Sequence, residues 1–279
     1  MERFLINGIP SEYVSASDRG LHYADGVFET IACIGSVPIF IEQHLNRMQT
    51  GARTLDIPFP DTRLILDDID CLLRDQAGNS VIKLVLTRGR GRRGYRYDSG
   101  LIPTRLCVRS DWPQYVAHWQ QRGIRAQFCE TPLSSHPVLH GIKTLGRLEN
   151  VLAGSELDAD IDEGFMSDVD GHVVEGTMSN IFAVIDDVLT TPDLSHCGIK
   201  GIMREQVIEA AYDGGIDVDI RDLSREQLLQ SNEIFICNSV IRICPVRQLA
   251  QQHYTNEAMT KTIDSLLQRR IDANAKAAA

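Results

Sequence analysis

The sequence of 279 residues lacks a long uncharged apolar run, although 43% of its residues are hydrophobic, so we expect no segment that spans a membrane. Its polar start, Met1-Glu2-Arg3, lacks the pattern of a signal peptide, which favours a cytoplasmic location. The seven cysteines include no Cys-x-x-Cys pair, which argues against a disulfide framework and a zinc site. The formal net charge is −10 and the one basic cluster is short, so we expect no nucleic-acid partner.

Short predicted strands and helices follow one another without an internal repeat. This irregular mixture predicts an α+β chain rather than the regular alternation of a doubly wound sheet. The length is sufficient for two modest domains, and Ser110-Asp-Trp-Pro-Gln-Tyr115 is predicted to be the linker between two halves. The clearest expected elements are strands at 27–34, 81–87 and 233–237, and helices that end near Leu55, that run from a cap at Asp61 to Leu73, and that occupy 256–270.

Lys143 lies in the stretch Leu139-His-Gly-Ile-Lys-Thr-Leu-Gly-Arg-Leu-Glu-Asn-Val-Leu152, just before a predicted helix. Leu145, Leu148 and Leu152 recur at intervals of three and four, which predicts a helix packed against a core. A lysine held against apolar surface loses hydration, and the resulting neutral amine is able to attack a carbonyl group. The spacing alone also fits a surface lysine on the first turn of a helix.

Glu175 follows the predicted strand at Val173-Val174 and precedes Gly-Thr-Met-Ser-Asn180. These residue types also form ordinary turns that satisfy their own backbone. A pyridoxal phosphate enzyme needs a lysine for the Schiff base, an acidic partner for the ring nitrogen, and a phosphate cup of backbone amides with an arginine. Lys143 and Glu175 are therefore candidates for the first two parts of such a site.

Three segments resemble the fold-type IV pyridoxal phosphate enzymes, namely 141–149 around Lys143, 173–182 around Glu175, and Gly201-Ile-Met-Arg204. That group includes branched-chain aminotransferases, D-amino acid aminotransferases and 4-amino-4-deoxychorismate lyases. The similarity extends in the family's order from Ile6-Asn-Gly, through 17–30, to 236–239, and so covers nearly the whole chain. It implies a small N-terminal α/β domain at 1–109, a linker at 110–118, a larger barrel-like α/β domain at 119–279, and a homodimer.

The resemblance also implies a role for each matching residue. Lys143 would form the Schiff base with pyridoxal 5'-phosphate and then move protons as a neutral amine. Glu175, ionised, would keep the pyridine nitrogen protonated. The remaining cofactor contacts would come from the Arg47 guanidinium, from the Ile202 and Met203 amides at a helix start, from the Ser239 hydroxyl and from Asn180, while Thr30 would assist a proton transfer. Arg47 also fits a solvated helix face, and Thr177, Ser179 and Asn180 also fit a closed turn.

The branch of the family depends on a few positions. Branched-chain aminotransferases generally carry a tyrosine five positions after the lysine, where this chain has Leu148, whereas D-amino acid aminotransferases tolerate a leucine. Arg147 and the cluster Arg88-Gly-Arg-Gly-Arg-Arg-Gly-Tyr95 resemble the lyase pattern more closely. The resemblance therefore implies a lyase that makes 4-aminobenzoate and pyruvate for folate biosynthesis, with a D-amino acid or branched-chain aminotransferase as the alternative. Arg88, Arg93 and Arg147 are the candidates for the two carboxylates of the lyase substrate, since guanidinium groups bind carboxylates in a planar, paired geometry.

Overall fold

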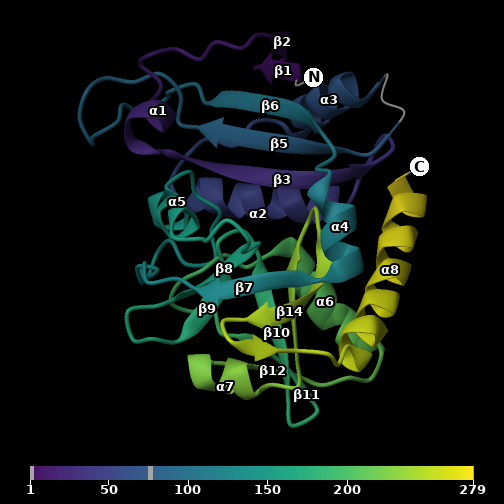
Figure 1. Ribbon diagram of the computed structural model, residues 1–279. Coiled ribbons are helices and arrows are strands. Elements are labelled where there is room, and N and C mark those ends of the chain that lie inside the picture. Colours follow the sequence, from purple (N-terminus) through teal and green to yellow (C-terminus); the bar gives the residue numbers. More distant parts are fainter. Residues whose placement is uncertain (1–2, 75–77, 279) are drawn as a thin grey trace. The chain divides into compact units, whose positions relative to one another are not determined.

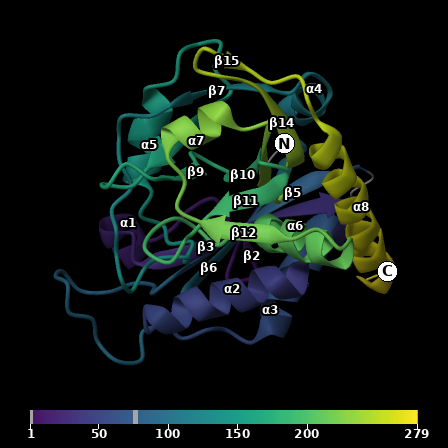
Figure 2. The same ribbon diagram turned by 90° about the horizontal axis from the view of Figure 1, so that it is seen from below.

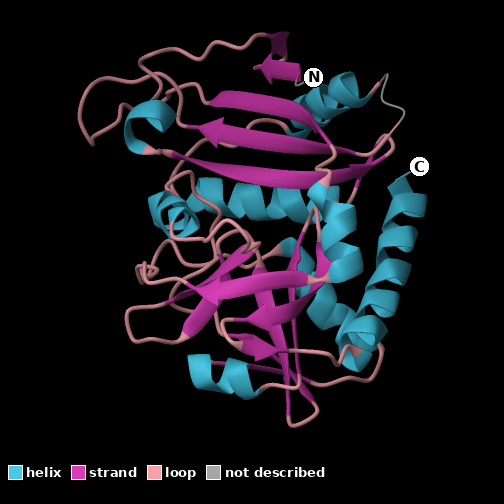
Figure 3. Cartoon of the chain, in the orientation of Figure 1, coloured by secondary structure: helices cyan, strands magenta, loops and turns pink. Residues whose placement is uncertain are grey.

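A computed structural model describes residues 3–74 and 78–278, which form two compact units of mixed helices and strands (Figure 3). The first unit consists of Met1–Pro113, Ile142–Gly146 and Asn274–Ala279, and the second of Gln114–Gly141 and Arg147–Ala273. The α+β class is thereby confirmed. The boundary between Pro113 and Gln114 lies within the segment 110–118 expected as the linker. Residues 142–146, which carry Lys143 and pair with a strand of the first unit, belong to that unit rather than to the larger domain expected at 119–279.

The first unit is built on a six-stranded antiparallel sheet. Its strands, in spatial order, are β2 (Ile9–Pro10), β1 (Arg3–Ile6), β6 (Thr104–Asp111), β5 (Ser80–Thr87), β3 (Gly26–Ile34) and β4 (Val37–Pro38). Successive side chains of a strand point to opposite faces, so Val27, Glu29 and Ile31 share one face of β3, while Phe28 and Thr30 share the other. The strands predicted at 27–34 and 81–87 are β3 and β5.

Two helices, α2 (Ile41–Thr54) and α3 (Thr62–Leu73), cover the face of this sheet that carries Val27 and Ile31 (Figures 1 and 2). Their apolar stripes meet the strands in one buried cluster, in which Met48 and Ile69 are almost fully enclosed. Asp61 caps α3 as predicted, because its carboxylate accepts the Arg63 N–H at 2.9 Å. A short helix, α1 (Arg19–Tyr23), precedes β3.

The second unit is built on a mixed sheet of nine strands. Eight of them follow the order β12 (Val218–Arg221), β11 (Val188–Pro192), β10 (Asn180–Ile185), β13 (Glu233–Asn238), β14 (Arg242–Leu249), β7 (Ile124–Phe128), β8 (Glu163–Ser167) and β9 (Val173–Gly176), and β15 (Gln252–His253) pairs with β14. β9 lies at one end of that order, yet residues 177–179 alone join it to β10. The sheet therefore curls, which agrees with the barrel-like larger domain that the resemblance implied.

The helices of the second part of the chain are α4 (Tyr115–Arg122), α5 (Leu148–Ser155), α6 (Ile202–Asp213), α7 (Arg225–Gln230) and α8 (Ala258–Ala278). α4 occupies residues 115–118 of the segment expected to be a linker, and β6 occupies residues 110 and 111 of it. α8 continues beyond the end predicted near Arg270. Within residues 3–74 and 78–278, no helix is long and apolar enough to cross a membrane.

The apolar stripe that follows Lys143 does not face a core. Helix α5 begins at Leu148, which is 76% exposed, and Val151 and Leu152 on the same side are also exposed. Only Ala153 of this helix is buried. The prediction that this stripe packs against a core is wrong. The spacing of the apolar residues indicates an apolar helix face, but that face is exposed.

Candidate active site

Lys143 lies on an extended segment that adds to the edge of the first unit's sheet. Thr144 pairs antiparallel with Val27, and the Phe28 N–H donates to the Lys143 carbonyl oxygen at 3.0 Å. Ile142, on the other side of the lysine, is buried in the cluster beneath the sheet. Alternation along the segment therefore turns Ile142 into the core and Lys143 to the opposite face, so the backbone direction at the lysine is fixed from both sides.

The amine of Lys143 lies over the face of the Phe28 ring. Its Nζ is 4.5 Å from the ring centroid, and the Nζ of Lys83, from β5, is 5.3 Å from the same centroid. Thr30 shares this face of β3 with Phe28 and is paired with Lys83 in the ladder. The same face of the sheet thus carries the predicted Lys143 and Thr30, together with the amine of Lys83, which the sequence did not single out.

The position of Arg47 is fixed by the buried carboxylate of Glu29, which lies on the face of β3 opposite Phe28 and Thr30. Its Nε and Nη2 donate to the two oxygens of Glu29 at 2.8 and 2.5 Å, in the planar paired geometry that suits a guanidinium. The Nδ1 of His44 lies 2.7 Å from Glu29 Oε2. Glu29 and His44 are almost fully buried. The fixed carboxylate of Glu29 therefore orients the guanidinium of Arg47, the predicted phosphate-binding arginine.

The charges of this cluster follow from its burial. Burial alone would raise the pKa of Glu29, but the charge of Arg47 and the hydrogen bonds from His44 and Arg47 lower it to about 2. Burial lowers the pKa of His44, and the charges of Arg47 and Lys143 act in the same direction against the hydrogen bond to Glu29. His44 therefore remains neutral and donates its Nδ1–H, and the contact with Glu29 is a hydrogen bond rather than an ion pair.

Arg88 is enclosed within the first unit. Its Nε and Nη2 donate to the Asp25 carboxylate at 2.7 and 3.0 Å, and its Nη1 and Nη2 donate to the carbonyl oxygens of Asp56 and Leu55. The Tyr97 ring covers the guanidinium at 3.6 Å from its centroid. Four of the five N–H groups of Arg88 therefore donate to groups of the chain itself. This geometry does not favour the predicted contact with a substrate carboxylate.

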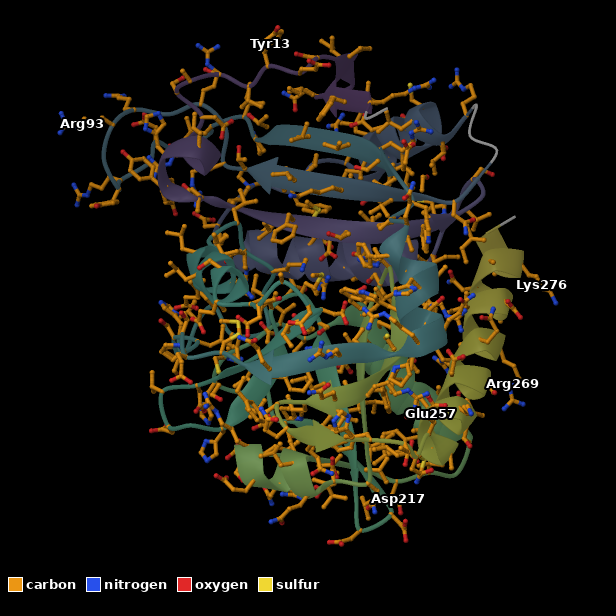
Figure 4. The ribbon with its side chains drawn as sticks, viewed as in Figure 1. Tyr13, Arg93, Asp217, Glu257, Arg269 and Lys276 are labelled. Atoms are coloured by element: carbon orange, nitrogen blue, oxygen red, sulfur yellow. The ribbon has the colours of Figure 1, made fainter. Side chains whose placement is uncertain are left out.

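The other two predicted arginines are more accessible. Arg93 is exposed and points outward from the loop that follows β5 (Figure 4). That loop is anchored by Arg19, which donates to the carbonyl oxygens of Gly94 and Tyr95. Arg147 is half-buried and occupies the N-cap position of α5. Of the three arginines, Arg93 and Arg147 are the ones that a carboxylate is able to reach.

In the second unit, Glu175 and Asn180 hold the same residue, Ile199. Glu175 is buried near the end of β9, and its Oε2 accepts the Ile199 N–H at 2.8 Å. Asn180, the first residue of β10, donates its Nδ2–H to the Ile199 carbonyl oxygen at 3.0 Å. Ile199 also pairs with Gly141, two residues before Lys143 in the chain. Both predicted polar residues thus fix the segment that leads to α6.

The start of α6 offers backbone donors. Its N-cap is Gly201, which has no side chain to bind the first amides of the helix, and the first two helical residues are Ile202 and Met203. A Cβ atom at Gly201 would lie 2.0 Å from the Asn180 Oδ1, so only glycine allows this approach. The first N–H groups of a helix and its dipole favour an anion, which fits the predicted role of the Ile202 and Met203 amides.

Ser239 lies on a turn at the end of β13 that Asn238 closes. The Asn238 Oδ1 accepts the Val240 and Ile241 N–H groups at 2.9 Å each, and its Nδ2 donates to the Met178 carbonyl oxygen at 3.1 Å. Ser239 is half-buried. The turn that carries Ser239 is thereby tied to the turn between Glu175 and Asn180.

The predicted residues form two sets, one in each unit. The first unit contains Lys143, Thr30 and Arg47. The second unit contains Glu175 together with Asn180, Ile202, Met203 and Ser239. A protonated pyridine nitrogen requires an acceptor such as a buried carboxylate, and a phosphate requires donors such as the amides at a helix start, so the residues fit pyridoxal phosphate. Within the described residues, no group of three or more histidine, cysteine, aspartate or glutamate side chains is arranged to hold a metal ion.

Sequence reasoning missed the supporting residues Glu29, His44 and Asn238. Glu29 left one signal, because it is the single charged residue among the apolar positions 27, 31 and 33 on the same face of a predicted strand. A charge at such a position needs a partner when it is buried. Neither His44 nor Asn238 has a comparable signal in the sequence.

Comparison with known proteins gives a consistent result. The model of the amino-transferase class IV family matches residues 26–249. The aminodeoxychorismate lyase of Vibrio harveyi is 36% identical, covering 87% of this chain and 90% of its own length. A putative branched-chain-amino-acid aminotransferase of Methanocaldococcus jannaschii is 32% identical, covering 94% and 92%. The crystal structure of 4-amino-4-deoxychorismate lyase from Pseudomonas aeruginosa has a TM-score of 0.90 at 38% identity, covering 96% of this chain and 99% of its own.

Proposed function

This chain belongs to the amino-transferase class IV family, and we propose that it is a pyridoxal-phosphate-dependent lyase that converts 4-amino-4-deoxychorismate into 4-aminobenzoate and pyruvate. The observation that carries the proposal is the similarity to two lyases along nearly the whole chain, one in sequence and one also in fold. Arg147 and the arginine cluster after β5 support the same branch. The product would serve folate biosynthesis.

Pyridoxal phosphate supplies an electron-accepting ring that stabilises negative charge on the carbon next to the bound amine. In this proposal Lys143 would hold the cofactor covalently, and the ionised Glu175 would keep the ring nitrogen protonated. Arg47, oriented by Glu29, and the amides of Ile202 and Met203 bind the phosphate, because a guanidinium and a helix start both favour an anion. Ser239 and Asn180 complete these contacts.

Lys143 is also the proposed base. Its neutral Nζ would remove the proton from the amine-bearing ring carbon of the substrate, the bond between the neighbouring ring carbon and the ether oxygen would break, and the Nζ would return a proton to the departing enol, which becomes pyruvate. The ring of the substrate becomes aromatic in the same sequence, so the protein has mainly to aim one base and hold two carboxylates. Thr30 lies on the Phe28 side of β3 and is proposed to assist this proton transfer.

Arg93 and Arg147 are the proposed partners of the substrate carboxylates. Both are accessible, and a guanidinium offers two parallel N–H groups to a carboxylate. Arg88 is assigned instead to the support of the loop that carries Arg93, because Asp25 and two backbone carbonyl groups occupy it.

We further propose that the enzyme is a cytoplasmic homodimer. The exposed apolar stripe of α5, formed by Leu148, Val151 and Leu152, supports a partner surface, since an apolar helix face gains free energy when another protein covers it. The seven cysteines are free thiols, six of them buried, which suits a reducing compartment.

Two assays separate the lyase from the aminotransferase, the alternative that the similarity to the Methanocaldococcus protein favours. The first follows pyruvate from 4-amino-4-deoxychorismate, and the second follows glutamate from D-alanine or a branched-chain amino acid with 2-oxoglutarate. We expect pyruvate formation to dominate. Glutamate formation without pyruvate would replace the lyase with the aminotransferase.

A further inference from the structure

Glu163 is a buried carboxylate of the second unit to which the proposed reaction gives no task. It is the first residue of β8, and it is fully buried. Its Oε1 accepts the N–H groups of Gly164 and Thr177 at 2.9 and 3.0 Å, together with the Thr177 hydroxyl. Its Oε2 accepts the Ser179 hydroxyl at 2.7 Å. One carboxylate thus gathers donors from both ends of the turn at 177–179, which joins β9 to β10.

The carbonyl groups of the same turn are held by two asparagines. The Asn150 Nδ2 donates to the Thr177 oxygen at 3.0 Å, and the Asn238 Nδ2 donates to the Met178 oxygen at 3.1 Å. Thr177 and Met178 therefore have fixed carbonyl directions as well as fixed donors. The turn is held by side chains from three other elements of the second unit, which gives it a single conformation.

Close packing at Gly176 shows how tightly the carboxylate meets this turn. The Gly176 N–H donates to the Ser179 carbonyl oxygen at 2.7 Å. A Cβ atom on Gly176 would lie 2.3 Å from the Ser179 Oγ and 2.9 Å from the carboxyl carbon of Glu163. Because Gly176 has no side chain, Glu163 and Ser179 are able to occupy the space beside its Cα atom.

The turn sets the spacing of the two residues that hold Ile199. Glu175 precedes the turn and Asn180 follows it, and they bind the N–H and the carbonyl oxygen of Ile199 respectively. A change in the turn would move the end of β9 relative to the start of β10. The direction of the Glu175 carboxylate would change with it, because its strand ends at the next residue.

We propose that Glu163 is a positioning residue for the cofactor: by holding the turn at 177–179, it fixes the Glu175 carboxylate and Asn180 relative to Ile199. This inference rests on the proposed function, since it assumes that Glu175 binds the ring nitrogen. Glu163 itself touches neither Glu175 nor Ile199 among its hydrogen bonds, and acts through Thr177 and Ser179.

The chemistry of Glu163 supports this role. Burial raises the pKa of its carboxyl group above the ordinary value, while the hydrogen bonds from Thr177 and Ser179 act in the opposite direction. Burying a carboxylate is unfavourable unless its oxygens accept hydrogen bonds. No apolar side chain and no amide is able to accept all of these donors, because an amide replaces one acceptor oxygen with an NH₂ group.

Glu233 provides a matched control in the same unit. It is also buried, and its carboxylate accepts the Met259 and Thr260 N–H groups at 3.0 and 2.9 Å and the Thr260 hydroxyl at 2.8 Å. These donors belong to the start of α8 and not to the turn at 177–179. Glu233→Gln therefore reproduces the loss of a buried carboxylate with a similar set of donors, without altering that turn.

The experiment compares Glu163→Gln with Glu233→Gln in the full chain. Apoprotein is titrated with pyridoxal phosphate to obtain the dissociation constant, the visible absorption maximum of the bound cofactor is recorded, and the thermal midpoint of each apoprotein is measured. We expect Glu163→Gln to raise the dissociation constant at least tenfold and to shift the absorption maximum, because the ring nitrogen loses its fixed partner. Glu233→Gln should lower the thermal midpoint and leave the dissociation constant within twofold of the wild type.

A dissociation constant and an absorption maximum for Glu163→Gln that match those of Glu233→Gln would overturn the positioning role and leave the proposed function intact. If Glu163→Gln does not fold, Ser179→Ala carries the test, since it removes one hydroxyl donor at little change in volume. It should weaken binding at least threefold, and unchanged binding and absorption would overturn the inference. A wild type that binds no pyridoxal phosphate would refute the proposed function and this inference together.

Discussion

Acid should destabilise the chain through Glu29, and the structure gives the magnitude. The pKa of Glu29 is about 2 in the folded chain against an ordinary value of 4.5. A folded-state pKa below the unfolded value means that the unfolded state binds a proton first as the pH falls, so the stabilisation is complete above pH 4.5 and is lost toward pH 2. At about 1.4 kcal/mol per unit, the shift corresponds to about 3 kcal/mol of the free energy of unfolding.

The assay is urea unfolding of apoprotein at pH 5 and pH 3, followed by far-ultraviolet circular dichroism, for the wild type and Glu29→Gln. Starting at pH 5 keeps the ordinary titration of histidines largely outside the interval. The stability advantage of the wild type over the variant should shrink by about 2 kcal/mol between the two pH values, because residue 29 titrates only in the wild type. The exposed ion pair between Arg92 and Asp98 supplies the control: the difference in free energy of unfolding between the wild type and Asp98→Asn should change little between pH 5 and pH 3.

An advantage of the wild type over Glu29→Gln that stays the same at pH 5 and pH 3 would refute the reasoning. That result would mean that the buried carboxylate is not held ionised by Arg47 and His44 in the folded chain. The geometry of the cluster would then have no electrostatic consequence for folding.

Four further predictions concern the site, the fold and the assembly. Glu175→Gln should leave the cofactor bound but slow turnover at saturating substrate, because the ring nitrogen loses its charged partner; unchanged turnover would remove Glu175 from the mechanism. Arg93→Ala and Arg147→Ala should each lower kcat/KM by about ten- to a hundredfold, the equivalent of about 1.5 to 3 kcal/mol, with normal cofactor absorption, and an effect below threefold in both would contradict carboxylate binding. Arg88→Ala should instead lower stability by about 1 to 3 kcal/mol in chemical unfolding, since Asp25 and two backbone carbonyl groups lose their hydrogen bonds from Arg88 while Arg19 still binds Asp25, and wild-type stability would argue against the structural role. Leu152→Asp should yield a monomer in sedimentation, and an unaltered dimer would exclude the α5 stripe from the interface.

Residue patterns within a short segment predicted those strands and helices whose stabilising contacts repeat with the period of the element. β3 and β5 alternate around a buried face, and Asp61 is a cap whose acceptor role depends only on the residue two positions ahead. Elements with conflicting local signals were missed. β14 contains Pro245, which removes a backbone donor and argues against a strand, and the alanine-rich end of α8 has high helix propensity but lies beyond the helix predicted at 256–270.

The candidate site shows the same limit. Its residue types are visible in short motifs around Lys143 and Glu175, because family resemblance is carried by local sequence. The partners that decide what each residue does come from distant segments. Asp25 reaches Arg88 across 63 positions, and this contact favours a structural role for Arg88 over the expected contact with substrate. Likewise, the apolar period of α5 was correctly recognised, but no local feature indicates whether a core or another protein covers it.

Product analysis with 4-amino-4-deoxychorismate decides whether this chain is the proposed lyase. Purified protein loaded with pyridoxal phosphate is incubated with this substrate, and pyruvate and 4-aminobenzoate are quantified together, with Lys143→Ala as the matched variant. The wild type should form the two products in equal amounts, whereas Lys143→Ala should form neither and lose the visible absorption of the lysine-bound cofactor. Equal products from Lys143→Ala, or none from a wild type that binds the cofactor, would contradict the proposed function.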